Sequence, residues 1–332
     1  MARAVGLLSG GLDSMLAVSL LQRQHVDILA VSFVTPFFGS DRAEEAARRL
    51  GVAFRAVDIT ARHLDVVKHP KHGYGRNMNP CIDCHALMLN VAGKIMEAEG
   101  YDFLFTGEVL GERPKSQSRP ALAVVAKESG YPDLVLRPLS AKLLDPTKPE
   151  RERLVDRERL LDFRGRSRKR QMALAAEFGI TEYPSPAGGC RLTDPGYSRR
   201  LRDLLDRESD AGADDMRLLA LGRHLRLAEK TRFVLGRNKE ENEKLEGLFR
   251  PGDLKLFVRG VMGPTGLLRG SADEGARRLA ASICVRYSDA PRDKASPVRL
   301  VPIPNTMTGA AGVEEELSAT PAPAEVIDPR II

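Results

Sequence analysis

Two sets of residues have the types and spacing needed for chemistry. The first is a run between an apolar stretch and a periodic apolar segment, Ser9-Gly10-Gly11-Leu12-Asp13-Ser14. A strand, a glycine turn and a helix in this order point backbone N–H groups at the turn, where a phosphate binds well because no Cβ obstructs it. Asp13 would hold Mg²⁺ or orient the group being activated. The same run also fits a plain glycine turn in which Asp13 and Ser14 cap a helix.

The second set consists of cysteines. Cys81 and Cys84 form a Cys-x-x-Cys pair, and Cys190 follows two glycines that would let its loop fold back onto the pair. A proline before the pair and helical periodicity after it predict that the pair lies at a helix N-terminus, whose positive end favours thiolates. Cys284 lies in an apolar helical segment and is expected to be a small core residue.

Strand and helix patterns alternate through the first half of the chain. Strands are expected at 4–8, 28–33, 53–57 and 102–105, and helices at 15–21, 44–50 and 86–100. This alternation predicts a parallel sheet covered on both faces, which binds ligands beyond the carboxyl ends of its strands. Ser32 and Phe33, at the end of the second strand, are therefore candidates for the adenine side of a nucleotide site.

Length and composition set the outer limits. A chain of 332 residues predicts two domains, and 42% hydrophobic with 29% charged residues is typical of globular protein. No apolar run approaches the ~20 residues of a membrane span, and no signal peptide is recognisable, so we expect a cytoplasmic protein. Four cysteines are too few for a disulfide framework, and a net charge of +6 is compatible with a polyanionic partner.

Four blocks resemble known families. The run at 9–14 resembles the pyrophosphate-binding loop of the PP-loop ATPases, which adenylate a carbonyl oxygen with ATP. The run Thr106-Gly107-Glu108-x-Leu110-Gly111 with Ser116-Gln117 is similar to the tRNA 4-thiouridine synthetases, and the segments 79–84 and 136–142 are similar to the tRNA 2-thiouridylases. The resemblance implies a three-layer α/β PP-loop domain. It implies ATP binding by Ser9, Gly10, Gly11, Asp13, Ser14, Ser32, Phe33, Thr106, Gly107 and Gln117.

The implied activity is that of a tRNA thiouridine synthase, which adenylates a uridine carbonyl oxygen with ATP and Mg²⁺ and replaces it by sulfur. Asp13, Cys84 and Cys190 would be its catalytic residues. Two schemes stay open: a persulfide on Cys84 resolved by Cys190, or a [4Fe–4S] cluster held by Cys81, Cys84 and Cys190. We prefer the cluster because it uses all three cysteines, whereas zinc would need a fourth ligand such as His85. The sulfur donor is either free sulfide or a carrier.

Beyond residue 208 a second unit begins. The run Gly236-Arg237-Asn238-x-x-x-Asn242, with Gly263-Pro264, resembles NFACT-R-type RNA-binding domains, although Phe257 stands where that family usually has a histidine. The resemblance implies that tRNA is a partner and that Arg237 and Asn238 contact it. A separate basic cluster suits an RNA backbone, and equally an ordinary basic surface. Its members are Arg164, Arg166, Arg168, Lys169 and Arg170.

The expected organisation has four parts. They are a PP-loop domain (1–165), a basic connector carrying the third cysteine (166–209), a smaller α+β RNA-binding domain (210–290) and a Pro/Ala-rich, disordered tail (291–332). Two other functions fit the same sequence. One is a PP-loop ligase or amidotransferase that adenylates a small molecule, and the other is a non-catalytic RNA-binding protein that has kept an ATP-binding fold.

Overall fold

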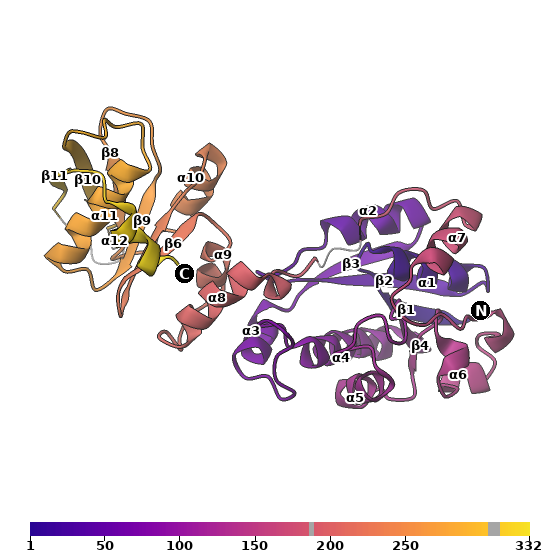
Figure 1. Cartoon of the computed structure of the whole chain (residues 1–332). Helices are drawn as coiled ribbons and strands as arrows, with labels where there is room; N and C mark the ends of the chain where they lie inside the picture. The colour runs from indigo at the N-terminus through magenta and orange to yellow at the C-terminus, as the bar shows by residue number, and fades with distance from the viewer. Residues whose placement is uncertain (186–188, 305–312) are drawn as a thin grey trace. The chain divides into compact units, whose positions relative to one another are not determined.

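A computed structural model describes residues 1–185, 189–304 and 313–332. It divides the chain into two compact units, 1–193 and 194–332 (Figure 1). The first unit contains β1 (Arg3–Leu7), α1 (Leu12–Gln22), β2 (Asp27–Val34), α2 (Asp41–Leu50), β3 (Ala53–Asp58), α3 (Thr60–Lys68), α4 (Cys81–Glu99), β4 (Phe103–Thr106), α5 (Arg119–Ser129), β5 (Val135–Leu136), α6 (Lys148–Arg151) and α7 (Lys169–Glu177).

The sheet of the first unit is parallel, as predicted. Its strand order is β3-β2-β1-β4-β5. The chain adds β2 and β3 on one side of β1 and then returns to add β4 and β5 on the other side, so the order of strand addition reverses between β1 and β4. Ligands of open α/β sheets bind beyond the carboxyl ends of the strands at this kind of reversal. The run Ser9–Ser14, which forms the turn after β1 and the start of α1, and the loop after β4, which carries Gly107, both lie there.

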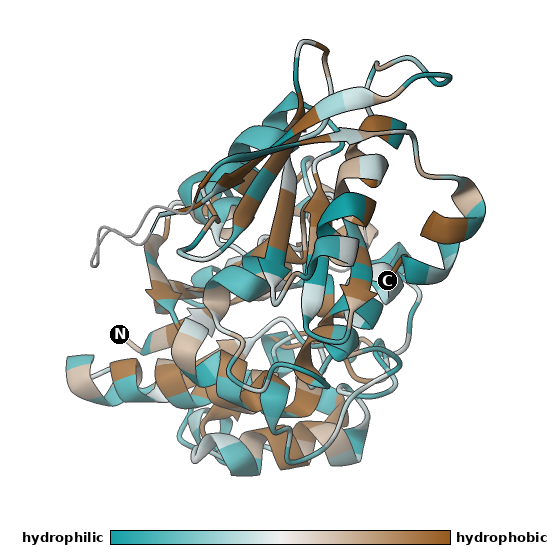
Figure 2. Ribbon diagram, turned by 90° about the vertical axis from the view of Figure 1, so that its left-hand side faces the viewer, coloured by the Kyte–Doolittle hydropathy of each residue, from teal (hydrophilic) through white to brown (hydrophobic). Residues whose placement is uncertain are grey.

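Alternation along β2 builds the core on both faces of this sheet. Ile28 and Ala30 belong to a cluster that contains α1 and α7 side chains, whereas Leu29, Val31 and Phe33 belong to a second cluster with α4 and α5. In Figure 2 hydrophobic residues (brown) alternate with hydrophilic ones (teal) along the ribbon. Helices therefore cover both faces, which confirms the predicted three-layer α/β architecture.

The second unit is built on an antiparallel sheet of order β11-β10-β8-β9-β7-β6. Its elements are α8 (Pro195–Leu205), α9 (Ala213–Leu218), β6 (Arg223–Ala228), β7 (Thr231–Leu235), α10 (Lys239–Glu246), β8 (Leu254–Val258), β9 (Gly266–Gly270), α11 (Glu274–Arg286), β10 (Ser296–Pro302), β11 (Glu315–Ala319) and α12 (Ala324–Ile327). Cys284 on α11 is fully buried in the core beside this sheet, as expected of a packing residue.

Two expectations about the chain's organisation differ from the structure. The predicted disordered tail is wrong at β10 and β11, where alternation buries Val298 and Leu300 against the sheet. The alternation of buried and exposed side chains is typical of a strand, and it predicts the structure of this segment better than its proline and alanine content does. The first unit also extends past residue 165, because Ala175 of α7 packs into its core. Residues 305–312 lie outside the described part of the tail.

None of the helices in the described ranges is long and apolar enough to cross a membrane.

Candidate nucleotide and sulfur site

The loop between β1 and α1 is closed by its own hydroxyl groups. Ser14 Oγ donates to the carbonyl oxygen of Gly11 (2.8 Å) and lies 3.2 Å from Ser9 Oγ. Gly10 has a φ of 74°, and a Cβ there would lie 2.4 Å from the carbonyl oxygen of Arg42. Only glycine fits this position. Gly11 has an ordinary φ of −81°, so the backbone requirement is stronger at Gly10.

The end of β4 lies directly against this loop. A Cβ on Gly107 would come within 2.5 Å of the backbone nitrogen of Ser14, so the absence of a side chain lets the two segments touch. The Oδ1 atom of Asp13 is buried and has no hydrogen-bond partner among the described residues. Burial raises the pKa of Asp13, while Arg168 and a hydrogen bond from Gln171 oppose the increase. A buried carboxylate oxygen without a partner fits a bound cation such as Mg²⁺.

The other residues expected to bind ATP lie in different surroundings. Ser32 shares a face of β2 with Ala30, whereas Phe33 points to the opposite face and is buried in the core there. These two side chains therefore do not face one site. Thr106 Oγ1 donates to Glu108 Oε2 (3.0 Å). Gln117 accepts at Oε1 from the backbone of Arg113 (3.1 Å) and closes the loop after β4.

Cys81 and Cys84 lie at the start of α4, as predicted. Cys84 is buried, and its Sγ lies 3.1 Å from Nε2 of His63. The His63 ring packs between Phe37 and Phe38, and its burial lowers the pKa of His63 to about 4.

Burial raises the pKa of the Cys84 thiol well above its usual range, and the nearby Cys190 and Cys81 raise it further. Burial disfavours the thiolate of Cys84, whereas the helix N-terminus favours it. The thiolate at this position stays a prediction.

Cys190 comes into the neighbourhood of the pair, since its charge affects the pKa of Cys84. Its backbone is anchored through Thr193, whose carbonyl oxygen accepts from Asn77 Nδ2 (2.7 Å). Burial raises the pKa of the Cys190 thiol to about 11. Part of the glycine loop before it, residues 186–188, lies outside the described residues.

Cys81, Cys84 and Cys190 are free cysteines, and they lie near enough for their charges to act on one another. Across residues 1–185, 189–304 and 313–332, no group of three His, Cys, Asp or Glu side chains is placed to hold a metal ion. Cys84 contacts His63, and Sγ of Cys81 accepts from Nδ2 of Asn79 (3.0 Å).

A buried ion network directly after Gly107 was not foreseen. Glu108 accepts from Arg137 Nε (3.0 Å) and lies 2.9 Å from His85 Nδ1. Burial alone would raise the pKa of Glu108, but the charges and hydrogen bonds of Arg137 and His85 hold it at about 2. The network joins the end of β4 to the residue that follows Cys84. The sequence did not predict the roles of His63 and Glu108, because a partner on another element leaves no local pattern. For Glu108, its place in the motif that contains Thr106 was a signal that could have been used.

Replacing Glu108 with glutamine should lower the free energy of unfolding by about 3 kcal/mol at pH 7, because the buried Arg137 would lose its countercharge. The pKa of Glu108 is lowered from 4.5 to about 2, so the stabilisation is complete above pH 4.5 and is lost as the pH falls towards 2. Urea unfolding across this pH range measures both effects. Glu45→Gln on the exposed face of α2 is the control, and equal stability of the Glu108 variant and the wild type would contradict the prediction.

The residues predicted to contact RNA have mixed surroundings. Arg237 is paired with Glu241, and Asn238 caps α10 by accepting from the Glu241 backbone nitrogen (2.9 Å). Hydrogen bonding from Arg237 lowers the pKa of Glu241 to about 2. These two motif residues thus stabilise the start of α10. Their contact with RNA stays a prediction.

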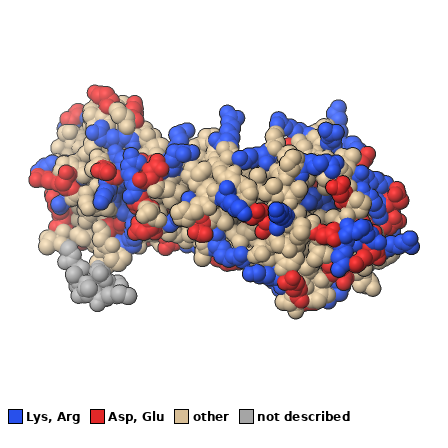
Figure 3. Space-filling model, turned by 90° about the horizontal axis from the view of Figure 1, so that it is seen from below, with Lys and Arg blue, Asp and Glu red and all other residues tan. Residues whose placement is uncertain are grey.

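The basic cluster is also divided. Arg164, Arg166 and Lys169 are exposed, and Arg170 pairs with Asp162 (2.5 Å). Arg168 differs from the others because its charge acts on Asp13. On the face shown in Figure 3, basic and acidic side chains are interspersed.

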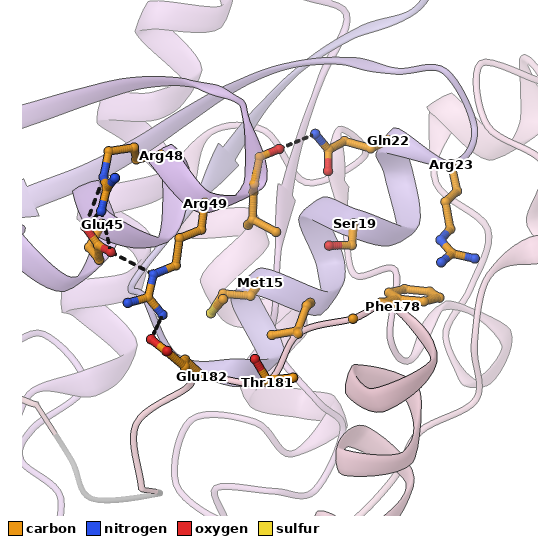
Figure 4. A pocket seen from close by; sticks show the side chains of 13 residues that line it. Met15, Ser19, Gln22, Arg23, Glu45, Arg48, Arg49, Phe178, Thr181 and Glu182 are labelled. Carbon is orange, nitrogen blue, oxygen red and sulfur yellow. Dashed lines mark hydrogen bonds and ion pairs between the residues drawn. The ribbon is translucent and has the colours of Figure 1, made fainter.

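A cavity of about 730 Å³ lies between α1, α2 and residues 178–182 (Figure 4). Arg49 is paired there with Glu45 (2.7 Å) and Glu182 (2.5 Å), and the Arg23 guanidinium lies 3.9 Å from the centre of the Phe178 ring. Since Arg49 already has two carboxylate partners, this cavity is a poorer phosphate site than the loop at Asp13.

Comparisons with known proteins agree with the motifs. Residues 1–143 match the family model described as thiamine biosynthesis protein (ThiI), and residues 222–327 match the NFACT protein RNA binding domain. Both predicted resemblances are confirmed.

Relatives with named activities match part of the chain. A probable tRNA sulfurtransferase of Caldanaerobacter subterraneus is 32% identical over 41% of this chain and 36% of its own length. A tRNA-specific 2-thiouridylase of Flavobacterium johnsoniae is 32% identical over 32% of this chain and 31% of its own. A solved 4-thiouridine synthetase–RNA complex with bound ATP has 23% identity, a TM-score of 0.35, and coverage of 54% of this chain and 52% of its own. The chain thus spans about a third of the length of these curated relatives.

Proposed function

We propose that this chain, which joins a ThiI-family region to an NFACT-type RNA-binding domain, is a tRNA thiouridine synthase that uses ATP. One observation carries the proposal most directly. A Cβ on Gly107 would lie 2.5 Å from the backbone nitrogen of Ser14, and the next residue, Glu108, lies 2.9 Å from His85, which follows Cys84. The end of β4 therefore contacts both the phosphate loop and the start of the cysteine-bearing helix, as expected if the two serve one reaction.

In the first proposed step, a uridine carbonyl oxygen attacks the α-phosphate of ATP and pyrophosphate leaves. Backbone N–H groups of the loop at 9–14 would hold the departing pyrophosphate. Asp13 would hold Mg²⁺, which neutralises charge on the phosphates when it is bound. The step converts a poor leaving group, oxide, into AMP.

In the second step, a sulfane sulfur carried on Cys84 attacks the activated carbon and AMP leaves with the former oxygen. The thiolate of Cys190 then attacks the Cys84 sulfur, so that the terminal sulfur stays on the uridine and a Cys84–Cys190 disulfide forms. An external thiol has to reduce this disulfide between turnovers. The other scheme, a [4Fe–4S] cluster held by Cys81, Cys84 and Cys190, stays open beside this thiol route.

The second unit would supply tRNA binding. Its NFACT match covers 222–327, a range that includes β6–β11. If phosphate contacts dominate, tRNA affinity should fall steeply as salt is raised.

Incubating the full chain with unmodified tRNA, Mg²⁺-ATP, a persulfide donor and a thiol reductant tests the proposal. Expected are tRNA-dependent pyrophosphate release and a thiolated uridine detected by nucleoside mass spectrometry. Pyrophosphate release that needs a small carboxylate or amide rather than tRNA would favour a ligase or amidotransferase. Tight tRNA binding without ATP turnover would indicate a non-catalytic RNA-binding protein.

A further inference from the structure

The segment after residue 163 pairs with the loop that follows β4. Arg164 forms a β-bridge with Leu110, and the Gly165 backbone nitrogen donates to the Leu110 carbonyl oxygen (2.8 Å). The chain then enters α7, which packs against α1 through Ala175 and the shared apolar core. Arg168 is the residue immediately before α7. Both ends of this short segment are therefore fixed.

The start of α7 lies near Asp13. Gln171, in the first turn of this helix, is buried with 1% of its surface exposed. Burial raises the pKa of Asp13, whereas the charge of Arg168 and the Gln171 side chain both lower it. The Arg168 guanidinium lies 5.9 Å from the centre of the Tyr183 ring.

Two buried atoms of opposite charge are left without partners at this place. Within the described residues, neither Oδ1 of Asp13 nor Nε of Arg168 makes a hydrogen bond. Leaving a buried polar group unpaired costs free energy, so each atom is expected to have a partner in the working state. A ligand that brings anionic oxygens together with a divalent cation satisfies both atoms at once, because the oxygens bind arginine and the cation binds aspartate.

We propose that Arg168 is a phosphate-binding residue for the triphosphate of Mg²⁺-ATP, held in place by the bridge between Arg164 and Leu110 on one side and by the packing of α7 on the other. This inference rests on the proposed use of ATP at the loop 9–14. It gives Arg168 a ligand other than the RNA backbone expected from its basic neighbours. Arg168 lies outside the 1–143 match, so this phosphate contact would come from a part of the chain that the family model does not cover.

Titration calorimetry with the full chain tests this, with inorganic pyrophosphate and a non-hydrolysable ATP analogue as separate probes in the presence of Mg²⁺. Arg168→Gln should weaken both by about 10- to 100-fold, the usual effect of losing a charge-assisted hydrogen bond. Arg168→Lys keeps the charge without the planar fork and should fall between the variant and the wild type. Adenosine, which has no phosphate, should bind all three proteins equally.

Arg48→Gln, on the exposed face of α2, is the matched control and should bind pyrophosphate like the wild type. An unchanged thermal midpoint of Arg168→Gln shows that the variant is folded. If folded Arg168→Gln binds pyrophosphate and the ATP analogue as tightly as the wild type, Arg168 is not a phosphate-binding residue, and the proposed function stands. If the wild type itself binds neither probe, the proposed ATP site fails and this inference fails with it.

Discussion

Replacing Cys84 or Cys190 with serine should abolish thiouridine formation while ATP and tRNA binding remain intact. Serine preserves shape but cannot carry a sulfane sulfur or form a disulfide. Both thiols lie near one another, and burial holds the pKa of each above its usual value, so neither is expected to react without a substrate beside it. Nucleoside mass spectrometry of reacted tRNA measures the loss, and equilibrium binding of ATP and tRNA checks that the sites persist.

Cys81→Ser is the matched control for this experiment. Cys81 starts α4 and contacts Asn79, and the persulfide scheme gives it no chemical step, so its variant should keep most of the activity. The cluster scheme makes the opposite prediction. Anaerobically purified protein with about four irons per chain, lost equally in the Cys81, Cys84 and Cys190 variants, would establish the cluster and overturn the thiol route.

The parts of the site that follow from neighbouring residues were predictable. Pro80 and the apolar spacing after it are local features, and α4 does begin at Cys81. The two glycines after β1 likewise signal the turn, although the structure puts the strict requirement on Gly10 rather than equally on both.

Residues whose role depends on packing between distant segments were not predictable. His63 has no motif of its own and meets Cys84 only because α3 packs beside α4. Arg168 looks in sequence like one member of a basic run, yet α7 turns it towards Asp13 while Arg164 and Lys169 remain exposed. The tail was misjudged because composition was weighed above the alternation that buries Val298. In each case the surroundings of the residue depend on a contact with a segment far away in the sequence, which a local pattern cannot reveal.

Asp13→Asn should reduce ATP-dependent pyrophosphate release by about 100- to 1000-fold, the range for losing a preorganised charged group at a reaction centre. Asparagine has nearly the same shape, so the loop closed by Ser9, Ser14 and Gly11 should persist. What disappears is the negative charge on the buried oxygen that has no partner among the described residues. Pyrophosphate release in the presence of tRNA is the measurement.

Asp27→Asn, at the exposed start of β2, serves as the control because it removes the same charge far from the loop along the strand. It should react like the wild type. Raising the Mg²⁺ concentration should restore part of the Asp13→Asn activity, because a weakened cation site fills at higher metal concentration. A variant that is fully active at low Mg²⁺ would show that Asp13 serves only as an acidic residue in the first turn of α1. The phosphate-loop assignment would then have no chemical support from this residue.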